Sequence, residues 1–216
     1  MEPGCAKSVF PDAPFRKDAM LKPFIAAAAL SLPLAACMAS PPDRLAGDQP
    51  PPTVENVDLD RYLGLWFEVA RADHGFEEGC QGVTAYYEYR DDGDIRVINR
   101  CWKDSLDGEL DVAEGRARLA EPGDTAKLEV SFFGPFFGDY WILELADDYS
   151  WAVVSEPAGR YVWILSRDPQ PGEAFIEERL SFLQSLGYDT EGLIYPQQWE
   201  SIDAMPTEGL PEGAVQ

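Results

Sequence analysis

Between residues 57 and 198, apolar and polar positions alternate over short stretches with the period of a β-strand. Val83, Ala85, Tyr87 and Tyr89 fall on one face of such a stretch, because successive side chains of a strand point to opposite faces. Turn residues separate each stretch from the next. We therefore predict eight strands joined by short loops, at 66–70, 83–89, 95–99, 112–119, 127–133, 139–145, 150–155 and 160–166.

One segment follows the period of a helix instead. Residues 173–186 carry Ile176, Leu180 and Leu183 at helical spacing, and Gly187 directly follows. A single amphipathic helix after a series of strands favours a closed barrel over a sandwich, with the helix packed on the outer wall. The predicted fold class is all-β: an eight-stranded antiparallel up-and-down barrel with one C-terminal α-helix.

The first part of the chain has the pattern of an export signal. Lys22 precedes an apolar run over residues 24–36, which is too short to span a bilayer. The run ends in Leu-Ala-Ala before Cys37, and this ending resembles the lipobox at which bacterial lipoproteins are cleaved and lipidated. We predict a signal peptide over residues 1–36, which starts at Met1 or at Met20, and a lipid on Cys37. An ordinary secreted protein with a chance cysteine is the alternative.

The segments beside the barrel differ from it in composition. Residues 37–56 are polar and rich in proline, which predicts a semi-extended linker behind the lipidated cysteine. Residues 57–198 make up the barrel domain. Residues 199–216 are acidic and contain Pro and Gly, which predicts a disordered tail.

Charge narrows the classes of partner. The chain has 39 Asp and Glu against 17 Lys and Arg, a formal net charge of −22. A nucleic acid requires a basic surface, so we predict no nucleic-acid partner. Anionic lipid headgroups would repel the chain, so membrane attachment requires the covalent lipid. With one His and four Cys in total, neither a metal site nor a cofactor is predicted.

Three short motifs occur in order: Gly-Leu-Trp at 64–66, Asp-Asp-Tyr at 147–149 and Arg167 after an apolar strand, with the aromatic run 132–136 between them. In this order they resemble the lipocalin family, with the bacterial outer-membrane lipoproteins and apolipoprotein D as its nearest members. The resemblance covers about 140 residues, nearly everything after the linker.

The resemblance implies structural roles for three residues. Gly64 allows a tight turn into the first strand, and Trp66 plugs the closed end of the barrel. The guanidinium of Arg167 lies across Trp66 in a cation–π contact. These residues close the barrel and do not select the ligand.

Cys80 and Cys101 flank the hairpin at 83–99. In an exported protein this pair predicts a disulfide near one rim, which requires a bulge or a diagonal pairing because the turn is not midway between them. Two free thiols are the alternative.

Lipocalins enclose one small apolar ligand, and alternate aromatic side chains suit such a pocket. The alternative is that these aromatics fill the barrel completely. His74 lies in the loop after the first strand, where it contacts a headgroup or makes only local hydrogen bonds. The candidate ligand contacts are Arg71, His74, Tyr87, Tyr89, Val97, Asn99, Phe132, Tyr140 and Trp163.

These observations favour a non-enzymatic lipocalin on the periplasmic face of the bacterial outer membrane. It would store or transport fatty acids or lysophospholipids, and a zwitterionic or neutral lipid suits the acidic chain better than a free anion. An enzyme acting on a bound lipid is the second hypothesis, with Cys80, Cys101 or a buried Glu such as Glu88 as the reactive group. A filled barrel with a structural role is the third. The oligomeric state is not predicted.

Overall fold

The computed structural model describes residues 50–215. The predicted signal peptide, Cys37 and the linker up to residue 49 lie outside this range. Within it, no helix combines the length and the apolar character that crossing a bilayer requires. In chain order the elements are α1 (Leu59–Tyr62), β1 (Gly64–Arg71), η1 (Gly75–Glu77), β2 (Cys80–Tyr89), β3 (Ile95–Lys103), β4 (Leu110–Leu119), β5 (Lys127–Phe133), β6 (Phe136–Leu145), β7 (Trp151–Ser155), β8 (Val162–Ser166), α2 (Glu173–Ser185) and η2 (Ile202–Ala204).

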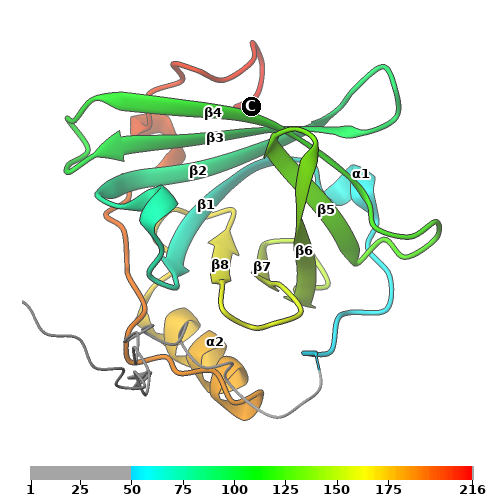
Figure 1. The fold of residues 1–216 in the computed structure, drawn as a ribbon. Helices are drawn as coiled ribbons and strands as arrows, with labels where there is room; N and C mark the ends of the chain where they lie inside the picture. Colours follow the sequence, from blue (N-terminus) through cyan, green and yellow to red (C-terminus); the bar gives the residue numbers. More distant parts are fainter. Residues whose placement is uncertain (1–49, 216) are drawn as a thin grey trace, which may run out of the picture. The chain divides into compact units, whose positions relative to one another are not determined.

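The eight strands close into one barrel, in which each strand is antiparallel to both of its neighbours (Figure 1). β1 pairs with β2 on one side and with β8 on the other, so the barrel has no free edge. Sequential strands are neighbours throughout, which is the order of an up-and-down barrel. The predicted fold class is confirmed.

The barrel wall separates two apolar clusters. Alternate strand residues point inward and pack together, among them Trp66, Val97 and Leu128. The residues between them point outward, and those of β1, β6, β7 and β8 join Leu183 of α2 in a second cluster. Because both faces of β7 and β8 are covered, these strands have nearly continuous apolar sequences rather than a polar alternation.

Arg167 and Trp66 seal one end of the barrel. The Arg167 guanidinium carbon lies 3.7 Å from the centroid of the Trp66 ring. The same guanidinium donates hydrogen bonds to the carbonyls of Tyr62 and Leu63, at 3.0 and 2.8 Å, and also to that of Leu65. Gly64 adopts a φ of 94°, which favours glycine, and its α-carbon faces this guanidinium. The end of β8 is thereby tied to the chain that enters β1.

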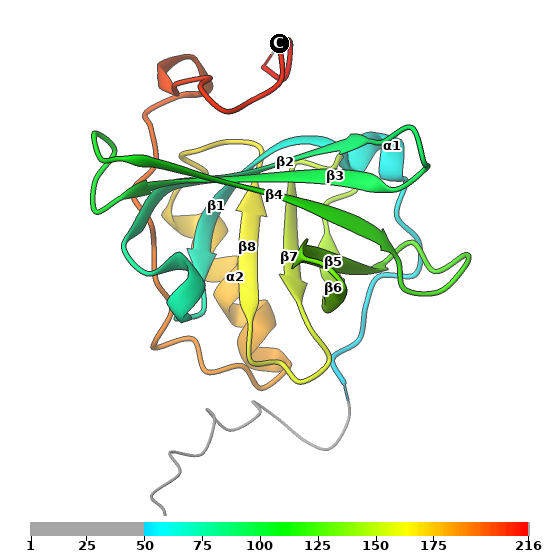
Figure 2. The same cartoon turned by 45° about the horizontal axis from the view of Figure 1, so that its top comes forward.

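α2 covers the outer wall near β6 and β7. Its Arg179 lies 3.8 Å from the centroid of the Trp151 ring and forms an ion pair with Glu144, with 3.5 Å between nitrogen and oxygen. Leu183 is fully buried beneath the helix. Figure 2 shows α2 lying against the strands on the side away from the C-terminal segment.

The segment after residue 198 packs on the barrel, whereas its composition predicts a disordered tail. Trp199 and Met205 are buried, and the Trp199 ring lies 4.6 Å from that of Trp102 on β3. Gly82 leaves room for this ring, because a β-carbon there would lie 2.3 Å from it. The prediction for residues 199–215 is corrected, since two apolar anchors outweigh the acidic composition of the segment.

One buried arginine holds this tail in place. Arg100, fully buried on the outer face of β3, donates to the carbonyls of Pro206 and Glu208 at 2.7 and 3.0 Å, and to the Thr84 hydroxyl at 2.9 Å. Backbone carbonyls are acceptors that any sequence supplies. Composition alone therefore does not reveal this contact.

We predict that Arg100→Leu releases the tail. The free energy of unfolding should fall by about 2–4 kcal/mol, because buried hydrogen bonds to a charged group are lost. Urea denaturation measures this change, and limited proteolysis after residue 199 reports the release. Arg96→Leu is the matched control: Arg96 lies on the same strand and the same outer face, but it is one-third exposed in surface ion pairs. Its loss should cost less than about 1 kcal/mol. Equal effects of the two substitutions would refute this role of Arg100.

Candidate ligand-binding site

The two ends of the barrel differ in how they are covered. α1 and the turns after β2, β4 and β6 lie at the closed end, which Trp66 and Arg167 seal. The loops after β1, β3, β5 and β7 lie at the other end, which we call the mouth. These mouth loops are residues 72–79, 104–109, 134–135 and 156–161.

Six of the predicted ligand contacts face the barrel interior. Tyr87 is paired with Val97 across β2 and β3, and Ala85 with Asn99. The Phe132 ring packs over Gly115, where a β-carbon would lie only 2.8 Å from it. The six predicted ligand contacts that the structure places on the interior face are Tyr87, Val97, Asn99, Phe132, Tyr140 and Trp163.

Tyr89 is a correction to the predicted set. By alternation from Tyr87 it would face inward, but it is the last residue of β2 and 50% of its surface is exposed. Its hydroxyl donates to Asp60 at 2.8 Å at the closed end. Alternation fails here because the barrel ends at this residue, so that no opposite wall covers the ring.

Three tyrosine hydroxyls meet on the floor of the interior. The Tyr140 hydroxyl lies 2.7 Å from that of Tyr62 and 3.1 Å from that of Tyr87. Burial raises the pKa of Tyr87 to about 12 and raises the pKa values of Tyr62 and Tyr140 well above the ordinary value. The floor is therefore polar but uncharged, and its hydroxyls satisfy one another.

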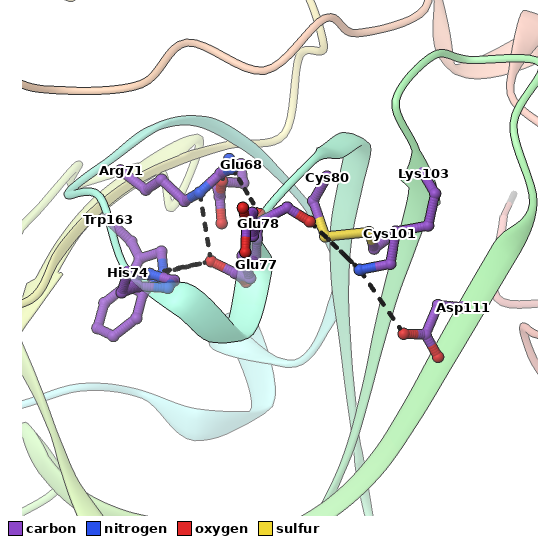
Figure 3. Close-up of a disulfide and its surroundings, with 10 residues drawn as sticks. All are labelled: Glu68, Arg71, His74, Glu77, Glu78, Cys80, Cys101, Lys103, Asp111 and Trp163. Atoms are coloured by element: carbon purple, nitrogen blue, oxygen red, sulfur yellow. Dashed lines mark hydrogen bonds and ion pairs between the residues drawn. A yellow bond between two sulfur atoms is a disulfide. The ribbon is translucent and has the colours of Figure 1, made fainter.

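Opposite charges meet at the mouth. The register between β1 and β8 shifts between Glu68 and Ala70, so that Glu68 and Arg71 contact each other three residues apart. Arg71 donates to Glu68 at 2.9 Å and to the backbone carbonyl of Glu77 at 2.8 Å. The Glu77 carboxylate lies 3.1 Å from His74 and 3.7 Å from the Nε of Arg71. We call Glu68, Arg71, His74 and Glu77 the mouth cluster (Figure 3).

The mouth cluster is buried, yet some of its polar atoms lack partners. Glu68, Arg71 and His74 are each less than one-tenth exposed. Burial, and next the nearby Glu77, raise the pKa of Glu68 well above its ordinary value. Within residues 50–215, the Nε of Arg71 and the Nδ1 of His74 have no hydrogen-bond partner. Because such atoms are costly to bury unpaired, they indicate a place for a polar group of a ligand or for water.

Aromatic rings stand beside these charges. His74 stacks on Phe76 with 3.7 Å between ring centroids, and Tyr161 and Trp163 lie 5.7 and 5.5 Å from the His74 ring. The indole nitrogen of Trp163 donates to the Glu77 carboxylate at 3.3 Å. An acidic group among aromatic faces is an environment that favours a cation.

The mouth cluster is braced from the side of β2 and β3. Cys80 and Cys101 form a disulfide with 5.1 Å between their α-carbons, and the register between these strands shifts between Gln81 and Thr84. The cysteines are thus joined diagonally, at the strand ends nearest the loop that carries η1 (Figure 3). This arrangement limits the movement of that loop at its C-terminal end.

Sequence reasoning missed Glu68, Glu77 and Tyr62. One signal was available, because Glu68 is a charged residue in the middle of an apolar strand, where an unpaired carboxylate would be costly. Glu77 and Tyr62 lie in a loop and a short helix, whose side-chain directions do not follow from strand alternation. Within residues 50–215 no group of His, Cys, Asp and Glu is arranged to hold a metal ion.

A separate groove of about 530 Å³ lies outside the barrel. It is formed by the end of β8, the start of α2 and the tail, and it includes Trp151, Phe175 and Ile202. Trp151 and Phe175 belong to the outer apolar cluster, and Arg167, which seals the closed end, also lines the groove.

Comparisons with known proteins agree with this architecture. Residues 57–198 match the family model of the lipocalin-like domain. The chain belongs to the lipocalin family. The outer membrane lipoprotein Blc of Vibrio cholerae is 44% identical over 146 residues, which cover 67% of this chain and 85% of that protein. The protein of the same name from Escherichia coli K12 is 39% identical over 178 residues, covering 82% and 97%.

Solved structures show the same fold at low sequence identity. Insecticyanin from the tobacco hornworm Manduca sexta superposes with a TM-score of 0.56 at 20% identity, over 74% of this chain and 88% of that one. This likeness concerns the lipocalin barrel alone.

The tyrosine floor gives a prediction for alkaline pH. The unfolded lipocalin releases phenolic protons near pH 10, whereas the folded one holds that of Tyr87 to about pH 12, and burial also raises the pKa values of Tyr62 and Tyr140 well above the ordinary value. The free energy of unfolding therefore falls as the pH rises above about 10. Tyr140→Phe should cost about 1–2 kcal/mol at pH 7, because two buried hydroxyls lose their shared partner. It should also reduce the loss of stability above pH 10 by up to about 1.4 kcal/mol per pH unit.

Urea unfolding at pH 7 and at pH 10.5 measures both effects. Tyr195→Phe is the control, since Tyr195 is a half-exposed tyrosine outside the barrel interior. If the free energy of unfolding of Tyr140→Phe falls with pH as steeply as that of the unsubstituted protein, this phenol does not cause the loss of stability at alkaline pH.

Proposed function

We propose that this lipocalin is a lipid-anchored protein of the bacterial outer membrane, on its periplasmic face, which stores or carries a single-chain lipid. Relatives at 44% and 39% identity are named outer membrane lipoproteins, which supports the location. The Leu-Ala-Ala-Cys sequence that ends at Cys37 supports the anchor. A lipid on Cys37 also explains how so acidic a chain is held at a membrane.

The interior suits an acyl chain. Its lining is apolar from Leu128 up to the paired Val154 and Trp163, and burial of each methylene of a ligand contributes about 0.8 kcal/mol. A closed barrel is rigid before the ligand arrives, which lowers the ordering cost of binding. The acyl chain would point towards the tyrosine floor and leave its polar end at the mouth.

The mouth cluster is the observation that carries the choice of headgroup. The Nε of Arg71 and the Glu77 carboxylate place opposite charges 3.7 Å apart at the rim of an apolar interior. Rings lie beside Glu77, and the Arg71 Nε makes no hydrogen bond. A zwitterionic head presents an ammonium group to the carboxylate and rings, and a phosphate to the arginine and His74. A lysophospholipid with an ethanolamine or choline head makes both the ammonium contact and the anionic contact. A free fatty acid makes only the anionic contact, to the arginine and His74.

The side chains named for the enzymatic alternative are engaged elsewhere. Cys80 and Cys101 are joined to each other, so neither offers a thiol. Glu88 points outward, and its carboxylate accepts a hydrogen bond from Arg96 at 2.8 Å. Glu68 is the buried glutamate of the mouth cluster, and its carboxyl is paired with Arg71 at 2.9 Å. These pairings favour a binder without catalysis.

Native mass spectrometry of the form that lacks residues 1–37 tests the carrier function. Titration with lysophosphatidylethanolamine, lysophosphatidylglycerol and palmitate should give one-to-one adducts, with the zwitterionic lipid bound about tenfold more tightly, a difference of about 1.4 kcal/mol. One-to-one adducts of equal affinity would leave the carrier function standing and remove the headgroup preference. If no lipid forms an adduct, the barrel is filled and the structural hypothesis replaces the carrier.

The role of Glu77 is tested by Glu77→Gln. Affinity for lysophosphatidylethanolamine should fall about tenfold, because a charge-assisted contact to the ammonium group is lost, while affinity for palmitate should not fall. Glu114→Gln is the control, since Glu114 is an exposed carboxylate on the outer face of β4. Equal losses for both lipids would indicate a distorted loop and not a headgroup contact.

A further inference from the structure

Three phenylalanines are exposed at the mouth without any role in the barrel. Phe133 and Phe136 are 84% and 79% exposed, and Phe76 is 64% exposed. Phe133 and Phe136 face each other as the last pair of β5 and β6, on either side of the loop 134–135. We call residues 133–136 the Phe hairpin. Large apolar side chains exposed to this degree mark a contact surface.

The neighbouring aromatics show that this exposure is specific. Phe137 directly follows and is covered by Arg118, whose guanidinium carbon lies 4.0 Å from the ring centroid. Phe132 directly precedes and packs inward against Gly115. Of four phenylalanines in six residues, the two at the tip are therefore the ones left in solvent.

The charge around the hairpin limits what it can contact. No charged residue occurs between Glu129 and Asp139, although the whole chain has a formal net charge of −22. A basic protein partner would be recognised by carboxylates, which this tip lacks. An uncharged tip with two aromatic rings suits the boundary between headgroups and acyl chains, where apolar side chains are buried without any need for countercharges.

We propose that the Phe hairpin inserts into the surface of the lipid bilayer, so that the mouth opens onto the membrane from which the ligand is taken or to which it is delivered. Phe76 is exposed on another mouth loop, the one that carries the mouth cluster. This inference uses the anchor and the lipid ligand of the proposed function, but it concerns a surface that neither of them requires.

The length of the linker permits this contact. Twelve residues lie between Cys37 and Pro50, and an extended chain over these thirteen steps reaches at most about 45 Å. The ten-residue strand β2 spans about 33 Å. An anchor at Cys37 therefore allows the mouth to reach the bilayer whichever way the barrel is turned.

Fluorescence of the exported mature protein, reconstituted into vesicles of phosphatidylethanolamine and phosphatidylglycerol, tests the insertion. An environment-sensitive dye on Phe136→Cys should shift to the blue and be quenched by lipids that carry a quencher in the acyl chain. The same dye on Tyr89→Cys is the control, since Tyr89 is half exposed at the closed end. An aqueous, unquenched dye at position 136 would overturn the proposal. So would shielding that appears only with native membranes and not with pure lipid, because it would identify a protein partner.

Lipid transfer tests the consequence. The double variant Phe133→Ser and Phe136→Ser should slow the exchange of a fluorescent lysophospholipid between protein and vesicles about tenfold, while its equilibrium affinity for that lipid in detergent-free solution stays within about twofold. Unfolding by urea should be unchanged, because both rings are in solvent. Unchanged exchange with unchanged affinity overturns the membrane contact alone. If the unsubstituted protein itself does not bind the lysophospholipid, the proposed function would be overturned instead.

Discussion

The contact of Arg167 with Trp66 is the constraint on which the rest of the barrel depends. A barrel must join its first strand to its last, and these are the two strands farthest apart in the sequence. Arg167 makes this join twice, through its face on the Trp66 ring and through its N–H groups on the carbonyls of Tyr62 and Leu63. Cation–π contacts of this kind contribute about 2 kcal/mol when they are shielded from water. Because the same guanidinium also covers the floor, one side chain contributes both to the closure of the sheet and to the closure of its end.

The two ends of the barrel use polar groups in opposite ways. On the floor, the hydroxyls of Tyr62, Tyr87 and Tyr140 are hydrogen-bonded to one another and carry no charge. The floor therefore needs no polar group from a ligand. At the mouth, Arg71 and His74 retain buried nitrogens that make no hydrogen bond. Under the proposed function, this asymmetry would give an amphiphile one favourable orientation, with its acyl chain towards the floor and its head at the mouth. This orientation would follow from the nitrogens of Arg71 and His74 that lack hydrogen bonds at the mouth, and not from the hydrogen bonds already made on the floor.

The sequence predicts the barrel well and the site only in part. Strand alternation is a local property, so Tyr87, Val97 and Phe132 were assigned correctly to the interior face. It fails at Tyr89, where the barrel ends, and it cannot place Glu77 or Tyr62, which lie outside strands. The tail shows the same limit: Arg100 binds backbone carbonyls of Pro206 and Glu208, which leave no mark in composition. Contacts that depend on tertiary position, and not on the period of an element, escape prediction from a single sequence.

Under the proposed function, coverage of the outer wall by α2 and the tail would leave the mouth as the surface for ligand exchange. α2 buries the apolar side chains of β6 to β8, and the tail buries Trp102 on β3. The three exposed phenylalanines of residues 50–215 lie instead on two loops at the mouth, one of which carries His74 and Glu77. A ligand that enters from water would gain nothing from these rings, since it would already be exposed to solvent as it approached. A ligand that enters from a bilayer passes them while it is still partly buried, which lowers the barrier at the step where an acyl chain would otherwise be fully hydrated.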